Sequence, residues 1–100
     1  MPVDTNTDLP ALIKQKLNAQ IKVLYLSLTD ESHSHAGHNE QAKQGNTHFY
    51  LKIVSDDFKN LSLLKRHQKI NAILRKEYNM FHALRIKALS REEYERKNKT

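Results

Sequence analysis

Cysteine is absent from the chain, and glycine and proline occur only twice each among its 100 residues. Without thiols the chain forms no disulfide, cannot supply the ligands that soft metals prefer, and fits a reducing compartment. No apolar run approaches the roughly 18 residues of a membrane span. Residues 1–10 lack the basic and apolar regions of a secretory signal and the arginines of a transit peptide. We therefore expect a cytoplasmic protein that does not contact a membrane.

Signatures of the common catalytic sites are also missing. The chain has no cysteine nucleophile, no G-x-S-x-G elbow, no P-loop and no H-E-x-x-H zinc motif. Its adjacent carboxylates, Asp56 and Asp57, point apart in an extended segment, whereas an acid–base pair must converge on one substrate. We predict that the protein is not an enzyme.

Charge is distributed unevenly along the chain, whose formal net charge is +6. Residues 1–47 hold four Lys and Arg against five Asp and Glu, whereas residues 48–100 hold thirteen against six. A basic second half is typical of nucleic-acid-binding proteins, but the same side chains also suit the solvated faces of helices and strands. Both interpretations stay open at this point.

Hydrophobic periodicity predicts one small α+β domain, preceded by a flexible tail at residues 1–7. Leu9, Ile13 and Leu17 recur every four residues, as in an amphipathic helix, whereas residues 48–55 alternate as in a strand. The predicted elements are helix 8–20, strand 21–30, strand 48–55, helix 61–79, strand 81–88 and helix 90–98. This α-β-β-α-β-α order indicates a three-stranded sheet with helices packed on it.

The principal helix, residues 61–79, carries its apolar side chains on one stripe. The stripe consists of Leu63, His67, Ile70 and Leu74, flanked by Leu64 and Ile73. We expect this stripe to face the sheet, and the basic Lys65, Arg66 and Lys69 to lie mostly outside it, toward solvent.

Three of the six histidines fall in a long loop predicted between two strands, residues 31–47. The run "DESHSHAGHNEQ" places His33, His35 and His38 as H-x-H and H-x-x-H. Loops of this length are uncommon in compact domains and are often functional. Such pairs chelate zinc or nickel weakly, but a structural zinc site needs four ordered ligands. A solvated polar loop is the alternative.

The other three histidines lie in predicted helices and strands. His67 falls on the apolar stripe and His48 opens a strand, so we interpret both as structural residues. His82 opens the third strand, with the same parity as Leu84 and Ile86. Its ring is therefore expected to point toward the helix-covered face at the rim of the sheet, where one ring nitrogen stays accessible to a ligand.

Several motifs taken together resemble those of the BolA family. They are "DES" at residues 30–32, the strand opening "HF" at 48–49, "VSDDF" at 54–58, "RH" at 66–67, "HAL" at 82–84 and "EEY" at 92–94. Each motif alone is a weak signal, but their combination is specific. The resemblance covers residues 9–96, nearly the whole chain.

The resemblance implies a BolA-like domain at residues 8–97, with a fold akin to the type II KH arrangement. It also implies a heterodimer with a monothiol glutaredoxin that bridges a [2Fe–2S] cluster. In this family the histidine of "HAL" ligates the cluster, which here is His82. The second ligand comes from the loop after the first strand, where "DES-x-x-H" points to His35, with His33 and His38 as alternatives. The partner supplies its active-site cysteine and the thiol of bound glutathione.

The ligand chemistry agrees with that implication. Iron–sulfur clusters are normally held by thiolates, and in Rieske centres two histidines replace two of them on one iron. A chain without cysteine can supply only the histidine half, so it needs a partner to hold such a cluster.

The sequence departs from the family pattern at two positions. Asn60 stands where glycine is usual, and asparagine tolerates a left-handed backbone better than most residues. Tyr94 stands where tryptophan is common, which changes packing more than chemistry.

A DNA-binding transcriptional regulator is the alternative function. The G-x-x-G loop with which KH modules grip the nucleic-acid backbone is absent, and the corresponding turn reads "DDFKN". Phosphate contacts are then expected from Lys59, Lys65, Arg66 and Lys69. For the free protein we expect a monomer or a weak homodimer.

Overall fold

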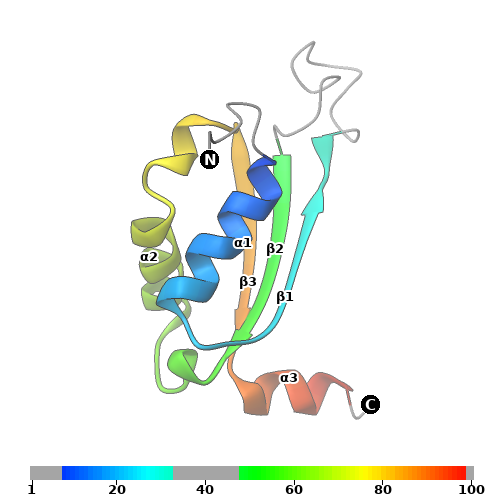
Figure 1. Ribbon diagram of the computed structural model, residues 1–100. Coiled ribbons are helices and arrows are strands. Elements are labelled where there is room, and N and C mark those ends of the chain that lie inside the picture. Colours follow the sequence, from blue (N-terminus) through cyan, green and yellow to red (C-terminus); the bar gives the residue numbers. More distant parts are fainter. Residues whose placement is uncertain (1–7, 33–47, 99–100) are drawn as a thin grey trace.

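The computed structural model describes residues 8–32 and 48–98, which form a three-stranded sheet with helices on both faces (Figure 1). Its elements are α1 (Leu9–Gln20), β1 (Val23–Asp30), β2 (His48–Ser55), the 3-10 turn η3 (Asp56–Phe58), α2 (Leu63–Ile73), the 3-10 turn η4 (Glu77–Asn79), β3 (Ala83–Leu89) and α3 (Arg91–Asn98). This order confirms the predicted α-β-β-α-β-α arrangement. Within the described ranges, every helix is too short or too polar to cross a membrane.

The sheet has the order β1-β2-β3, with β2 in the centre. β1 runs antiparallel to β2, and β2 runs parallel to β3, with His48 opposite Ala83. The last residue of β1 and the first residues of β2 and β3 therefore lie at one end of the sheet, at the top of Figure 1. We call this the loop end, defined by Asp30, His48 and Ala83.

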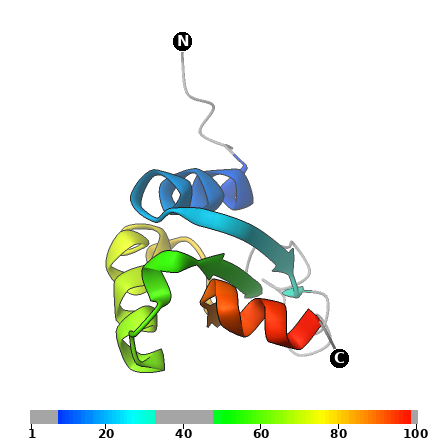
Figure 2. The same ribbon diagram turned by 90° about the horizontal axis from the view of Figure 1, so that it is seen from below.

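The hydrophobic core lies between one face of the sheet and the helices α1 and α2. Alternate residues of β2 point into it, as the strand pattern predicted, and α1 contributes the three leucine and isoleucine positions spaced four apart. The fully buried side chains are Ile13, Leu17, Phe49, Leu51, Ile53, Phe58, Ile70 and Leu74. Helix α3 lies against the opposite face (Figure 2).

The principal helix is shorter than predicted: α2 ends at Ile73, whereas the prediction extended it to residue 79. The chain turns after Leu74 and forms the separate turn η4. This turn buries Glu77 next to Lys16 of α1, with the ammonium 2.8 Å from the carboxylate. A long-range ion pair of this kind leaves no mark on helical periodicity.

The predicted stripe of α2 was wrong at its first turn. Leu63 and Leu64 are 65% and 66% exposed, whereas Arg66 is only 5% exposed. The inward-facing residues are Arg66 and Ile70, one turn apart, followed by the buried Leu74. His67 is half-buried, as predicted.

Two local features stand at the ends of elements, and the second, at Asn60, was predicted. Ser90 and Glu93 form a capping box at the start of α3, with the Ser90 N–H donating to the Glu93 carboxylate at 2.8 Å. Asn60 has a φ of 67°, so it adopts the left-handed backbone conformation that glycine otherwise favours.

Candidate metal-ligand site

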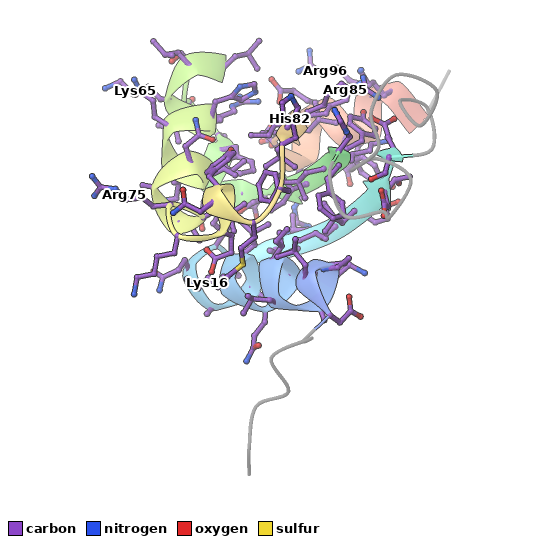
Figure 3. The ribbon with its side chains drawn as sticks, turned by 90° about the horizontal axis from the view of Figure 1, so that it is seen from above. Lys16, Lys65, Arg75, His82, Arg85 and Arg96 are labelled. Carbon is purple, nitrogen blue, oxygen red and sulfur yellow. The ribbon has the colours of Figure 1, made fainter. Side chains whose placement is uncertain are left out.

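His82 lies in a bend immediately before β3, at the loop end of the sheet (Figure 3). Its side chain is exposed, and its ring centroid lies 5.1 Å from that of His48. His82 precedes β3 instead of opening it, as the sequence predicted, so strand parity does not determine the face to which its ring points. The expectation of an accessible ring at the rim of the sheet agrees with the exposure.

His48 is the site residue that the sequence did not reveal. It is half-buried at the first position of β2, and its Cα partner across the parallel pair is Ala83, the residue after His82. Only this register brings the two imidazoles together. The periodicity of a single strand carries no information on its neighbour, so His48 was interpreted as a structural residue.

Hydrogen bonds join Glu31 and Ser32, which follow β1, to His48, the first residue of β2. The Asp30 carboxylate accepts from both the N–H and the hydroxyl of Ser32, which is fully buried. The Ser32 hydroxyl oxygen accepts from the N–H of His48 at 3.3 Å, and the Glu31 N–H donates to the His48 carbonyl at 2.7 Å. We call this set of bonds the loop stem. Ser32 and His48, the residues on either side of residues 33–47, therefore lie together at the loop end, with His48 beside His82.

Three of the predicted ligands fall on that intervening segment. His33, His35 and His38 lie outside the described residues. What the structure fixes is the position of the segment's two neighbours, Ser32 and His48, relative to His82.

An ion pair crosses the outward face of the sheet next to the loop stem. The Arg85 guanidinium donates two hydrogen bonds to the Glu31 carboxylate, at 2.8 and 3.0 Å, and lies 4.3 Å from the ring centroid of Tyr50. The hydrogen bonds to Glu31 raise the pKa of Arg85 above its usual value. The pair joins β3 to the first residue after β1, across the central strand.

The described residues do not form a self-contained metal site. No group of three or more His, Asp or Glu side chains within residues 8–32 and 48–98 is arranged to hold a metal ion. A closed zinc site needs four ligands, and the loop end offers the imidazoles of His82 and His48. A metal centre at this position therefore requires ligands from residues 33–47, which we call the histidine segment, or from another molecule.

The carboxylates Asp56 and Asp57 are occupied structurally. Asp56 binds the Arg91 guanidinium at 3.0 Å, and this contact holds the pKa of the Asp56 carboxyl below its usual value. Asp57 accepts a hydrogen bond from the N–H of Lys22 at 2.9 Å. As the sequence predicted, the two side chains do not converge on a common point.

Of the four predicted phosphate-binding residues, three are exposed lysines and the fourth, Arg66, is buried. Lys65 and Lys69 are exposed on α2, and Lys59 pairs with Glu92 at 3.1 Å. Arg66 was wrongly placed on this surface. Its buried guanidinium donates to the carbonyl oxygens of Leu61 and Ala88 and to the Glu93 carboxylate (2.6 Å), so it ties α2 to β3 and α3.

Comparison with known proteins identifies the family. The model of the family described as BolA-like protein matches residues 17–93. The DNA-binding transcriptional regulator BolA of Haemophilus influenzae is 36% identical over 90 residues, which cover 89% of this chain and 84% of that protein. SufE-like protein 1 of Arabidopsis thaliana is 41% identical over 81 residues, which cover 76% of this chain but only 22% of that longer protein.

The fold agrees with a solved structure of the same kind. BolA1 from Arabidopsis thaliana superposes with a TM-score of 0.74 at 31% sequence identity, covering 86% of this chain and 95% of that chain. The resemblance and the fold class inferred from the sequence are thereby confirmed. The chain belongs to the BolA family.

Proposed function

We propose that this protein is a non-enzymatic adaptor that contributes histidine ligands to a [2Fe–2S] cluster shared with a monothiol glutaredoxin and glutathione. The observation that supports this role best is the exposed imidazole of His82, which lies at the loop end beside His48, the residue that follows residues 33–47. The absence of cysteine fits a reducing compartment, and we propose the cytoplasm.

The shared arrangement follows from which ligands the chain lacks. A [2Fe–2S] cluster takes four protein-side ligands, mostly thiolates, and this chain has no thiol. His82 supplies one imidazole in this proposal, and His35 supplies the second, with His33 and His38 as alternatives. His48 is a further alternative, because its ring already lies beside that of His82. The partner's cysteine and the glutathione thiol supply the remaining two.

The chain's own residues have three tasks in this role. His82 presents its imidazole ring at the surface, where a metal can reach it. The loop stem through Ser32 fixes where the histidine segment begins and ends. The Arg85–Glu31 pair holds β3 against the stem. When bound, the cluster supplies one-electron chemistry and iron and sulfide for transfer to other proteins.

The test is anaerobic cluster reconstitution of an equimolar mixture with a monothiol glutaredoxin and glutathione. Visible absorption and circular dichroism should differ from those of the glutaredoxin alone, because two thiolates are replaced by imidazoles. Single substitutions His33→Ala, His35→Ala, His38→Ala and His48→Ala then identify the second ligand as the one whose loss changes the spectrum. A spectrum identical to that of the glutaredoxin homodimer would exclude a shared cluster.

DNA binding is the second candidate, favoured by the similarity to the DNA-binding transcriptional regulator BolA of Haemophilus influenzae and by two exposed lysines on α2. We propose that Lys65 and Lys69 contact phosphates in this role, without Arg66, which is buried. Binding should weaken steeply with salt, because each phosphate contact releases counterions. The double substitution Lys65→Gln/Lys69→Gln should flatten that slope, measured by fluorescence anisotropy on duplex DNA. A slope that the substitutions do not change would exclude this surface.

A further inference from the structure

A groove lies between α1 and α2, the two helices that cover one face of the sheet (Figure 1). It has a volume of about 410 Å³ and is lined by Lys16, Ala19, Gln20, Ala72 and Ile73. Ala19 and Ala72, one from each helix, are both exposed, and their methyl groups leave space that longer side chains would fill. The groove is therefore an open, partly apolar recess with room for a large apolar side chain.

Lys16 places a fixed positive charge in the lining of this groove. Its ammonium lies 2.8 Å from the buried carboxylate of Glu77, while its side chain stays 34% exposed. The other oxygen of that carboxylate, Oε1, is buried and has no hydrogen-bond partner within the described residues. Removing Lys16 from Glu77 would leave a buried, unpaired carboxylate, which is costly. The ammonium therefore keeps its position when a ligand enters or leaves the groove.

Helical spacing places a second lysine beside the groove. Lys69 precedes Ala72 by three residues and Ile73 by four on α2, so these three residues lie on one side of the helix. Lys16 likewise precedes Ala19 by three residues on α1. The apolar recess thus has a lysine on each of its two helices.

The surface around the groove carries charge of one sign. Residues 9–20 and 63–76 contain seven Lys and Arg and no Asp or Glu. Figure 3 shows Lys65 and Arg75 pointing outward on the side of the helices. Apart from the buried Arg66 and from Lys16, these cations form no ion pair with a carboxylate of residues 8–32 or 48–98; they are Lys14, Lys65, Lys69, Arg75 and Lys76. A partner complementary to this surface carries negative charge.

We propose that the groove docks an acidic segment of a partner protein, with one large apolar side chain of that segment inserted between Ala19 and Ala72. Carboxylates beside this anchor contact Lys16 and Lys69. At protein interfaces a few buried apolar anchors supply most of the binding energy, whereas complementary charge supplies specificity and a fast approach. The recess and the lysines provide these two contributions side by side.

A nucleic acid fits this site less well than an acidic polypeptide does. A DNA duplex presents phosphates that would pair with the lysines, but it carries no large apolar side group that would fill the recess. The groove includes neither His82 nor the loop stem, so this site is independent of the proposed cluster role. Substitutions in the groove should leave the spectrum of the shared cluster unchanged.

Peptide selection tests the site directly. A library of short random peptides is displayed on phage and selected on the immobilised full chain. Enriched peptides should combine Asp or Glu with a large apolar residue, and the Kd of a fluorescein-labelled copy is then measured by anisotropy. Enrichment of peptides without carboxylates, or no enrichment at all, would overturn the proposal.

Filling the recess should weaken the binding of the enriched peptide. Ala19→Phe should raise its Kd by roughly tenfold or more, because the new ring occupies the place of the anchor. Ala11→Phe, at an exposed position of α1 outside the groove lining, is the matched control and should bind like the wild type. Ala72→Phe fills the recess from the other helix and serves as the second variant if Ala19→Phe lowers the Tm. Equal binding by the wild type and both groove variants would contradict the proposed site.

Neutralising one lysine tests the contribution of charge. Lys69→Gln should raise the Kd of the peptide by roughly two- to fivefold, as expected for a partly exposed ion pair. Lys14→Gln makes the same change in net charge outside the groove lining and should have no effect. Two further results would overturn the proposal. They are weaker binding of duplex DNA by Ala19→Phe, and a wild-type dimer that Ala19→Phe dissociates in analytical ultracentrifugation, because they would assign the groove to nucleic acid or to a second copy of the chain.

Discussion

The rings of His82 and His48 lie 5.1 Å apart at the loop end of the sheet, although the two residues are far apart in the sequence. The parallel pairing of β2 and β3 produces this proximity, since His48 is opposite Ala83. The same end of the sheet carries the two attachment points of the histidine segment. The fold thus places the imidazoles of His82 and His48 beside each other, at the position proposed for the cluster.

The loop stem should depend on one buried hydroxyl. Ser32→Ala removes the hydrogen bond that this hydroxyl donates to the Asp30 carboxylate and the one that it accepts from the His48 N–H. The carboxylate and the N–H of the half-buried His48 each lose one partner. We expect a loss of about 1–3 kcal/mol in the free energy of unfolding, measured by urea denaturation. Ser27→Ala, in the middle of β1, is the matched control and should cost less. Equal losses in both variants would mean that the stem contributes no specific stability.

Acid should weaken the attachment of α3. The Arg66 guanidinium and the Ser90 N–H hold the pKa of Glu93 at about 2, below its usual 4.5. The charged Glu93 therefore stabilises the fold fully above about pH 4.5, and this contribution is lost as the pH falls through about 2.

The matching variant is Glu93→Gln. It should lose about 1–2 kcal/mol at neutral pH, because the Glu93 side chain is about one-third exposed and its pairing is partly screened. Its denaturation midpoint should fall less steeply than that of the wild type between pH 4.5 and pH 2. Parallel curves for the two proteins would contradict the role assigned to the Arg66–Glu93 pair.

The backbone at residue 60 should accept glycine and resist alanine. With φ at 67°, Asn60 is in a region that costs a residue with a Cβ about 1–2 kcal/mol. Asn60→Ala should therefore destabilise the protein, whereas Asn60→Gly should be neutral or slightly stabilising, both measured by thermal denaturation. A Gly variant less stable than the Ala variant would contradict a backbone cost at this position.

The sequence alone was sufficient for the order of elements and for the local signals. The bounds of β2 were predicted to the residue, because its hydrophobic alternation from His48 to Ile53 is clear and the burial of these residues follows it. The capping box of α3 and the left-handed Asn60 were also predictable, since both depend on neighbouring residues only.

What the sequence did not reveal depends on contacts between distant segments. Arg66 was assigned to solvent because it is charged, yet the Ala88 carbonyl and the Glu93 carboxylate satisfy its guanidinium in the interior. The end of α2 depends on the pairing of Glu77 with Lys16. The position of His48 beside His82 required the register of β2 against β3. Each of these is a tertiary contact that periodicity does not encode.

The central claim is that His82 is a ligand of the shared cluster, and one substitution tests it. The mixed complex with a monothiol glutaredoxin is reconstituted with wild type, with His82→Ala and with His67→Ala as the control, a histidine on α2 outside the loop end. The visible circular dichroism of the His82→Ala mixture should revert to that of the glutaredoxin homodimer, while the His67→Ala mixture keeps the wild-type spectrum. A His82→Ala spectrum identical to that of the wild-type complex would contradict the account.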